Sequence, residues 1–128
     1  NTAKMSQDVV ADALNQMMNA RRAKKSKVEL KHQSRLLLSV LAIAKLKGYV
    51  KHYETQDKIL KVELGNISGC NAIKPRYTVT TEEIEKYSKR LLPAKNIGIL
   101  IISTSHGLMT HLTALEKNIG GCLVAYFY

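Results

Sequence analysis

The sequence has few of the residues that build metal centres and disulfide-bonded domains. Among its 128 residues are two cysteines, two prolines, four histidines and no tryptophan. Cys70 and Cys122 do not form a Cys-x-x-Cys motif and the histidines are scattered, so the spacing argues against a structural zinc site. We expect both cysteines to be free thiols in a reducing compartment.

Long hydrophobic runs are also missing. No purely apolar stretch is longer than residues 122–128, and the run at 99–102 is shorter still, whereas a membrane-spanning helix needs about 18–20 such residues. Residues 1–5 lack the apolar core of a secretory signal. We therefore expect a cytoplasmic protein with no membrane partner.

Acidic residues are scarce relative to basic ones. The chain has 10 Asp and Glu against 20 Lys and Arg, and its formal net charge is +10. The apolar share of 45% is typical of a folded chain. The charge predicts a polyanionic partner, most often nucleic acid; an acidic protein and an anionic membrane are the alternatives.

The densest cluster, named here the basic run, consists of Arg21, Arg22, Lys24 and Lys25. It either contacts phosphate or is a solvated loop, and its density favours phosphate.

Hydrophobic periodicity predicts an α+β fold of two small lobes, separated within the turn-forming residues 65–69. Residues 1–65 are expected to form an α-β-α-β-β lobe. Its elements are a helix capped by Ser6 with apolar residues up to 18, the basic run as a loop, a strand at 27–31, a helix from Ser34 to Gly48, and strands at 49–54 and 59–64 joined by residues 55–58.

Residues 66–128 are expected to form a mostly antiparallel β lobe with short helices. Its elements are a strand at 72–80, a helix opened by a Thr80–Glu83 capping box, a buried strand at 98–103, a short helix after Thr110, and a strand at 122–127. The string at Ser103, Thr104, Ser105, His106 and Gly107 follows the buried strand and precedes the expected helix start. Hydroxyls and backbone N–H groups there suit phosphate and ribose, although an ordinary turn has the same composition.

We find no catalytic constellation, and expect neither an enzyme nor a cofactor, metal or small-molecule substrate. A Ser-dependent hydrolase is the alternative from another class, but adjacent residues such as Ser105 and His106 rarely have the geometry of a nucleophile and its base. A second binding candidate comprises Lys74, Arg76 and Tyr77. Its aromatic ring either stacks on a base or ribose, or packs under the strand edge.

Several segments, taken in order, resemble small-subunit ribosomal protein eight, called S-fifteen-a in eukaryotes. The similarity is strongest at residues 101–110, which read Ile-Ile-Ser-Thr-Ser-His-Gly-Leu-Met-Thr, and at 120–128, which begin with Gly-Gly. Residues 72–77 and 92–94 are similar to the archaeal and eukaryotic branch. The resemblance covers essentially the whole chain.

The resemblance implies two α/β lobes and direct binding to a helix in the central domain of small-subunit ribosomal RNA. It places the serine, threonine and glycine residues of 103–107 in the RNA minor groove, and polar and basic contacts of the first lobe around Lys31 and Ser34. The chain would be a structural constituent that stabilises an RNA fold during assembly, next to neighbouring small-subunit proteins. A free-standing RNA- or mRNA-binding regulator that uses the same surface is the alternative. The remaining RNA-binding candidates are His106, Met109, Thr110 and Arg35.

Overall fold

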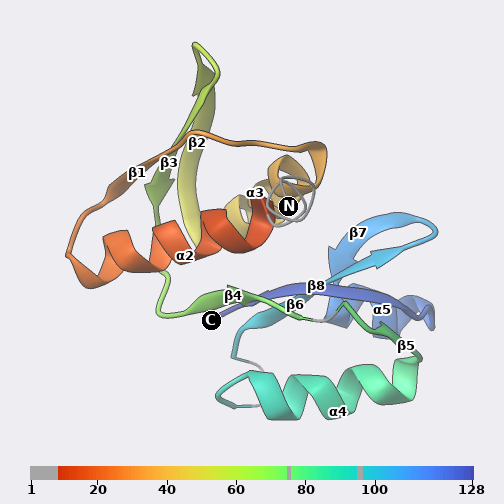
Figure 1. Cartoon of the computed structure of the whole chain (residues 1–128). Coiled ribbons are helices and arrows are strands. Elements are labelled where there is room, and N and C mark those ends of the chain that lie inside the picture. Colours follow the sequence, from red (N-terminus) through yellow and green to blue (C-terminus); the bar gives the residue numbers. More distant parts are fainter. Residues whose placement is uncertain (1–8, 75, 95–96) are drawn as a thin grey trace. The chain divides into compact units, whose positions relative to one another are not determined.

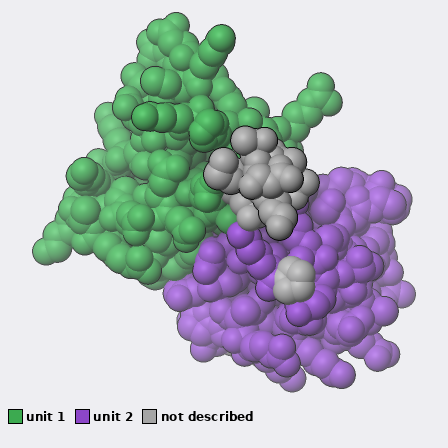
Figure 2. Space-filling view, viewed as in Figure 1, with its two compact units in different colours: residues 1–70 green, residues 71–128 purple. Residues whose placement is uncertain are grey.

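The structure, a computed structural model, describes residues 9–74, 76–94 and 97–128. The chain divides into two compact units, residues 1–70 and 71–128 (Figure 2). The expected cap Ser6 and the proline Pro75 lie outside the described residues. The assignment of residues 1–65 and 66–128 to separate domains stays a prediction.

The first unit has the predicted α-β-α-β-β order (Figure 1). The strands form an antiparallel sheet in the order β1–β3–β2. Leu60, Val62 and Leu64 alternate along β3 and are buried, because one face of the strand lies in the core. The elements are α2 (Val9–Arg22), β1 (Lys27–Leu30), α3 (Arg35–Leu46), β2 (Val50–Gln56) and β3 (Ile59–Leu64).

Local hydrogen bonds define the ends of α3 as the sequence predicts. The Ser34 hydroxyl accepts a hydrogen bond from the Leu37 amide at 3.1 Å, which satisfies a donor of the first turn. Gly48 follows the helix at a φ of 89°, and the amide of Tyr49 donates to the carbonyl of Ala44 at 2.9 Å. This is a Schellman motif, in which glycine avoids the penalty that a side chain has at positive φ.

The prediction that the basic run is a loop was wrong for its first half. Arg21 and Arg22 form the last turn of α2, where cations interact favourably with the helix dipole. The helix ends in a second Schellman motif, in which the Lys25 amide donates to Ala20 at 2.8 Å and Lys24 has a φ of 61°. The four cations therefore surround one helix end.

The turn between β2 and β3 is also tighter than predicted. Only Asp57 and Lys58 form it, at φ angles of 52° and 66°, whereas residues 55 and 56 still belong to β2. Positive φ at both positions is typical of a two-residue type I′ turn, whose twist matches that of the paired strands.

The second unit consists of a five-stranded sheet with α4 and α5 on one face (Figure 1). The strand order is β4–β8–β6–β7, and β5 pairs with β8. Its core combines Ile84 of α4 and Ala114 of α5 with Leu100, Ile102 and Leu123 of the sheet. The fold is thus α+β, as predicted. The elements are β4 (Cys70–Ala72), β5 (Thr78–Val79), α4 (Thr81–Leu91), β6 (Ile99–Thr104), β7 (Gly107–Thr110), α5 (His111–Lys117) and β8 (Gly121–Phe127).

Two predictions for the second unit need correction. The strand expected at residues 72–80 is divided into β4 and β5; Pro75 lies between them in the sequence, and proline has no N–H for a sheet hydrogen bond. The string at residues 103–107 does not precede a helix. It forms the turn of a β6–β7 hairpin, so the helix dipole gives no support to anion binding there. The capping box of Thr80 and Glu83 and the cap at Thr110 are confirmed.

Candidate nucleic-acid interface

The tip of the β6–β7 hairpin is held by its own hydrogen bonds. Thr104 and Gly107 are paired, and Ser105 and His106 form the exposed turn between them. The Thr104 hydroxyl donates to the Gly107 carbonyl at 2.9 Å and accepts from the His106 amide at 3.0 Å. Thr104 therefore organises the turn, and its hydroxyl is already engaged.

The two serines beside Thr104 have uncommitted hydroxyls. The hydroxyl of Ser103, which is half-buried, and that of Ser105, which is exposed, have no hydrogen-bond partner within the described part of the chain. Gly107 has a φ of 103°, and a Cβ added there would meet no atom within 4 Å. The tip thus presents two free hydroxyls beside a backbone segment that another molecule could approach closely.

The strand behind the tip is rigidly placed. β6 lies between β7 and β8, and Ile101 and Ile102 are fully buried. A Cβ at Gly121 would lie 2.4 Å from the Ser103 carbonyl oxygen, so β8 reaches its position beside β6 only because this residue is glycine. The backbone that carries the free hydroxyl of Ser103 is consequently held in a fixed position.

Met109 and Thr110 have structural contacts of their own. Met109 pairs with Ile102 and packs against the core of the unit. Thr110 is only 5% exposed, and its hydroxyl accepts from the Thr113 amide at 3.3 Å to cap α5. Both support the hairpin from its base, and their contact with RNA stays a prediction.

The second candidate, Lys74, Arg76 and Tyr77, lies in the connection between β4 and β5. All three residues are exposed, and the ring of Tyr77 is both packed and accessible. Its centroid lies 5.9 Å from that of Tyr87 on α4, while 46% of the residue remains exposed. The two alternatives for Tyr77 are therefore compatible.

The members of the basic run differ in their roles. The Arg21 side chain donates from Nε to the carbonyl of Ile67 at 3.0 Å, which ties α2 to the segment after β3. Arg22 makes only a local contact with Asn19, and Lys24 and Lys25 are exposed. The last three cations are available to phosphate.

The first-lobe candidates flank β1 at its other end. Ser34 is committed to the cap of α3, whereas Lys31 and Arg35 are exposed. Four residue steps along β1 separate Lys27 from Lys31, or about 13 Å at about 3.3 Å per residue. Cations therefore lie at both ends of this strand.

The strands of the first unit add no net charge. Three lysines and three glutamates alternate across them, and Lys51 lies 3.8 Å from Glu63. The excess positive charge of this unit consequently lies outside its sheet. This distribution leaves the helix and loop ends as the surfaces that suit a polyanion. The charged strand residues are Lys27, Glu29, Lys51, Glu54, Lys61 and Glu63.

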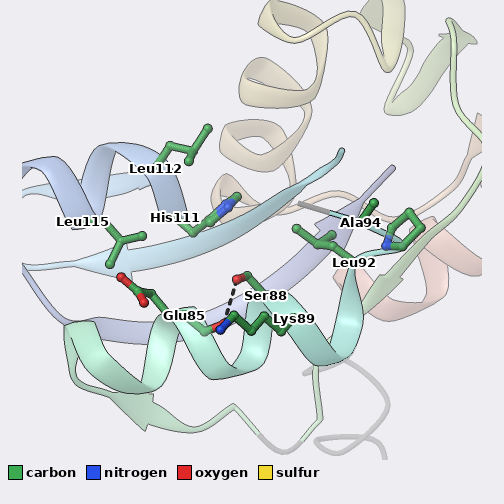
Figure 3. A pocket seen from close by; sticks show the side chains of 9 residues that line it. Glu85, Ser88, Lys89, Leu92, Ala94, His111, Leu112 and Leu115 are labelled. Atoms are coloured by element: carbon green, nitrogen blue, oxygen red, sulfur yellow. Dashed lines mark hydrogen bonds between the residues drawn. The ribbon is translucent and has the colours of Figure 1, made fainter. Parts of the chain in front are cut away.

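A groove of about 410 Å³ lies between α4 and α5 in the second unit (Figure 3). His111 lines it beside apolar residues such as Leu92 and Leu115, with Glu85 and Lys89 also in the lining. The Nδ1 atom of His111 accepts a hydrogen bond from the Leu100 amide at 3.1 Å. Burial lowers the pKa of His111 below 6.5. The ring is thus neutral at neutral pH and acts as an acceptor.

Acid should therefore destabilise the protein through His111. Protonation would turn Nδ1 into a donor that faces the Leu100 N–H. Because the folded state has the lower pKa, the contribution of His111 is present above about pH 6.5 and decreases as the pH falls below that value. We expect the melting temperature to fall more between pH 7.5 and 5.5 in the parent than in His111→Asn, whose Oδ1 can accept in place of Nδ1. Equal pH dependence in thermal melts would contradict this role.

The cysteines are free, as expected. Cys70 is buried, which raises the pKa of its thiol to about 12. The Cys122 thiol donates to the Arg76 carbonyl at 3.4 Å.

No group of three or more His, Cys, Asp or Glu residues that could hold a metal ion occurs among the described residues. Within the same ranges, no helix is long and apolar enough to cross a membrane.

The sequence prediction missed β7, although a signal for it was available. Residues 107–110 follow a two-residue polar turn after an apolar strand, a pattern that indicates a hairpin. The contact of Tyr77 with Tyr87 on α4 was also not predicted, because nothing local in the sequence connects the two residues.

Comparison with known proteins gives consistent results over nearly the whole chain. The model of the family described as ribosomal protein S8 matches residues 8–128. The chain is also 45% identical to the small ribosomal subunit protein uS8 of Nanoarchaeum equitans (strain Kin4-M), over 97% of this chain and 100% of that protein. With a family match of this extent and a full-length relative, the chain belongs to the ribosomal protein S8 family.

Proposed function

We propose that this chain is a structural constituent of the small ribosomal subunit in the cytoplasm, where it binds a helix of the small-subunit ribosomal RNA. The similarity to a small ribosomal subunit protein along its full length supports this role. Binding would stabilise one RNA fold during assembly, next to neighbouring small-subunit proteins. The mechanism needs no catalytic step.

The observation that carries the proposal is the hairpin tip. Double-stranded RNA has a shallow minor groove that displays 2′-hydroxyls and phosphates, and short hydroxyl side chains suit this surface. Ser103 and Ser105 have free hydroxyls, and Gly107 leaves space for a sugar–phosphate backbone. Because β6 is held in the core and the Thr104 hydroxyl closes the turn, the backbone of the tip loses little entropy on binding.

Charge and shape would be divided between the two units. The exposed cations Arg22, Lys24 and Lys25 would attract phosphate without regard to sequence. The hairpin tip would add the specific contacts. No observation favours the alternative of a free-standing regulator, and none favours a hydrolase.

Ser105→Ala should weaken binding to the RNA helix by about 1–3 kcal/mol, or about 5–150-fold, because a hydroxyl that accepts or donates in the complex would be lost. The side chain of Ser105 is exposed and fills no core space, so the melting temperature should hardly change. The measurement is a titration against a central-domain helix of small-subunit ribosomal RNA, paired with a melting curve.

Ser68→Ala is the matched control. Ser68 is also an exposed serine, in the segment after β3. If Ser105→Ala bound as tightly as this control, the hairpin tip would be an ordinary turn and the proposed binding surface would be wrong.

A further inference from the structure

One flank of α4 combines an aromatic pair with cations. The ring of Tyr87 lies 5.9 Å from that of Tyr77, with an interplanar angle of 29°. The guanidinium carbon of Arg90 lies 5.4 Å from the centroid of Tyr87. Three groups from two segments thus form a continuous ladder, which we name the tyrosine platform.

The platform has an accessible ring. Tyr77 is 46% exposed, and it is one of only four large hydrophobic residues of the described chain that are so exposed. Tyr87 is half-buried and packs against the core of the unit, so it supports Tyr77 from beneath. The other stacked pair, Tyr126 and Tyr128, is half-buried in both members.

Charge around the platform is positive. At about 100° per residue, Arg90 and Lys86 lie on the same flank of α4 as Tyr87. Two acids, Glu82 and Glu83, lie one turn before Lys86, and Glu83 accepts a hydrogen bond from the Thr80 amide at 2.9 Å in the capping box. From the other side, Arg76 directly precedes Tyr77 in the sequence and is exposed.

The tyrosine platform and the Ser103 hydroxyl lie on opposite faces of the sheet. Thr78 pairs with Cys122, and Cys122 pairs with Ser103. Two antiparallel strand spacings separate Thr78 from Ser103, or about 10 Å. Side chains alternate along a strand, so the ring of Tyr77, the residue before Thr78, lies on the face covered by α4, away from Ser103.

We infer that the tyrosine platform binds an unpaired RNA nucleotide, whose base stacks on the exposed ring of Tyr77 while Arg90 and Lys86 contact its phosphates. This inference rests on the proposed RNA-binding function and adds a second, single-stranded site to it. Aromatic rings bind bases by stacking whatever the sequence, because every base has a π-face.

The test uses the full chain and a single-stranded uracil octanucleotide with one central 2-aminopurine, whose fluorescence is quenched when the base stacks. Tyr77→Leu should abolish the quenching and weaken binding by about 5–150-fold, the range for one stacked base. Tyr77→Phe should keep both, because it keeps the ring. Tyr128→Leu, which removes a ring from the other stacked pair, should behave as the parent.

A variant that leaves the fold unchanged and a crosslinking measurement complete the test. Arg90→Gln with Lys86→Gln changes only exposed residues and should make the salt dependence of octamer binding shallower. In the unmodified protein, a 5-bromouracil octamer should crosslink to Tyr77 under ultraviolet light. Quenching that survives in Tyr77→Leu, an unchanged salt dependence, or crosslinks only elsewhere would overturn the platform. If the parent protein did not bind the ribosomal RNA helix, that result would instead contradict the proposed function.

Discussion

Gly121→Ala is expected to lower the free energy of unfolding by about 3 kcal/mol or more, since overpacking against a rigid backbone is among the most costly core changes. The added Cβ would lie 2.4 Å from the Ser103 carbonyl oxygen and 2.8 Å from the Ile102 side chain. A carbonyl in a central strand cannot yield without breaking the pairing between β6 and β8. The hairpin tip would move with β6, so binding to RNA should fall as well.

Gly48→Ala is the matched control for this change. Gly48 has a φ of 89°, and no atom would lie within 4 Å of its Cβ, so the substitution should cost only the backbone strain of about 1–2 kcal/mol. Thermal and denaturant unfolding of both variants gives the comparison. A Gly121→Ala variant as stable as the parent would show that β8 is not held against β6 as described.

The variant Arg22→Gln, Lys24→Gly, Lys25→Gln is expected to bind target and non-target RNA more weakly by similar factors. If all three cations contact phosphate, the slope of log K against log salt should become shallower by about 2–3, at about 0.7–0.9 for each contact. Arg21 is retained, because its bond to the Ile67 carbonyl stabilises the first unit. Lys24→Gly removes a side chain from a left-handed position, so the variant should not be less stable.

Lys51→Gln, Lys58→Gln, Lys61→Gln is the control with the same change in net charge. Its substitutions fall on the β2–β3 hairpin, where the sheet is balanced in charge. Binding of both variants to a target and an unrelated RNA helix is measured at several salt concentrations. This comparison distinguishes direct phosphate contacts of the basic run from the effect of the net charge of the protein. An equal loss of slope in the two variants would mean that the basic run acts only through net charge.

The candidate binding site could be predicted from the sequence only in part. The string at 103–107 and the cations were identifiable by residue type, but the separate roles of Thr104 and Arg21 were not. Thr104 bonds to groups two and three residues away, in a turn that forms only when β7 pairs with β6. Arg21 bonds to a residue 46 positions away. That these surfaces contact RNA stays a prediction.

The sequence by itself determined the features that depend on near neighbours. Ser34, Thr80 and Thr110 cap helices through bonds to residues three positions away, and the apolar run at 99–102 is buried in a strand as its composition indicates. Only the tertiary structure decided the contact of Tyr77 with Tyr87 and the close approach of Gly121 to Ser103. Each of these depends on where another segment packs, and local periodicity contains no information about that position.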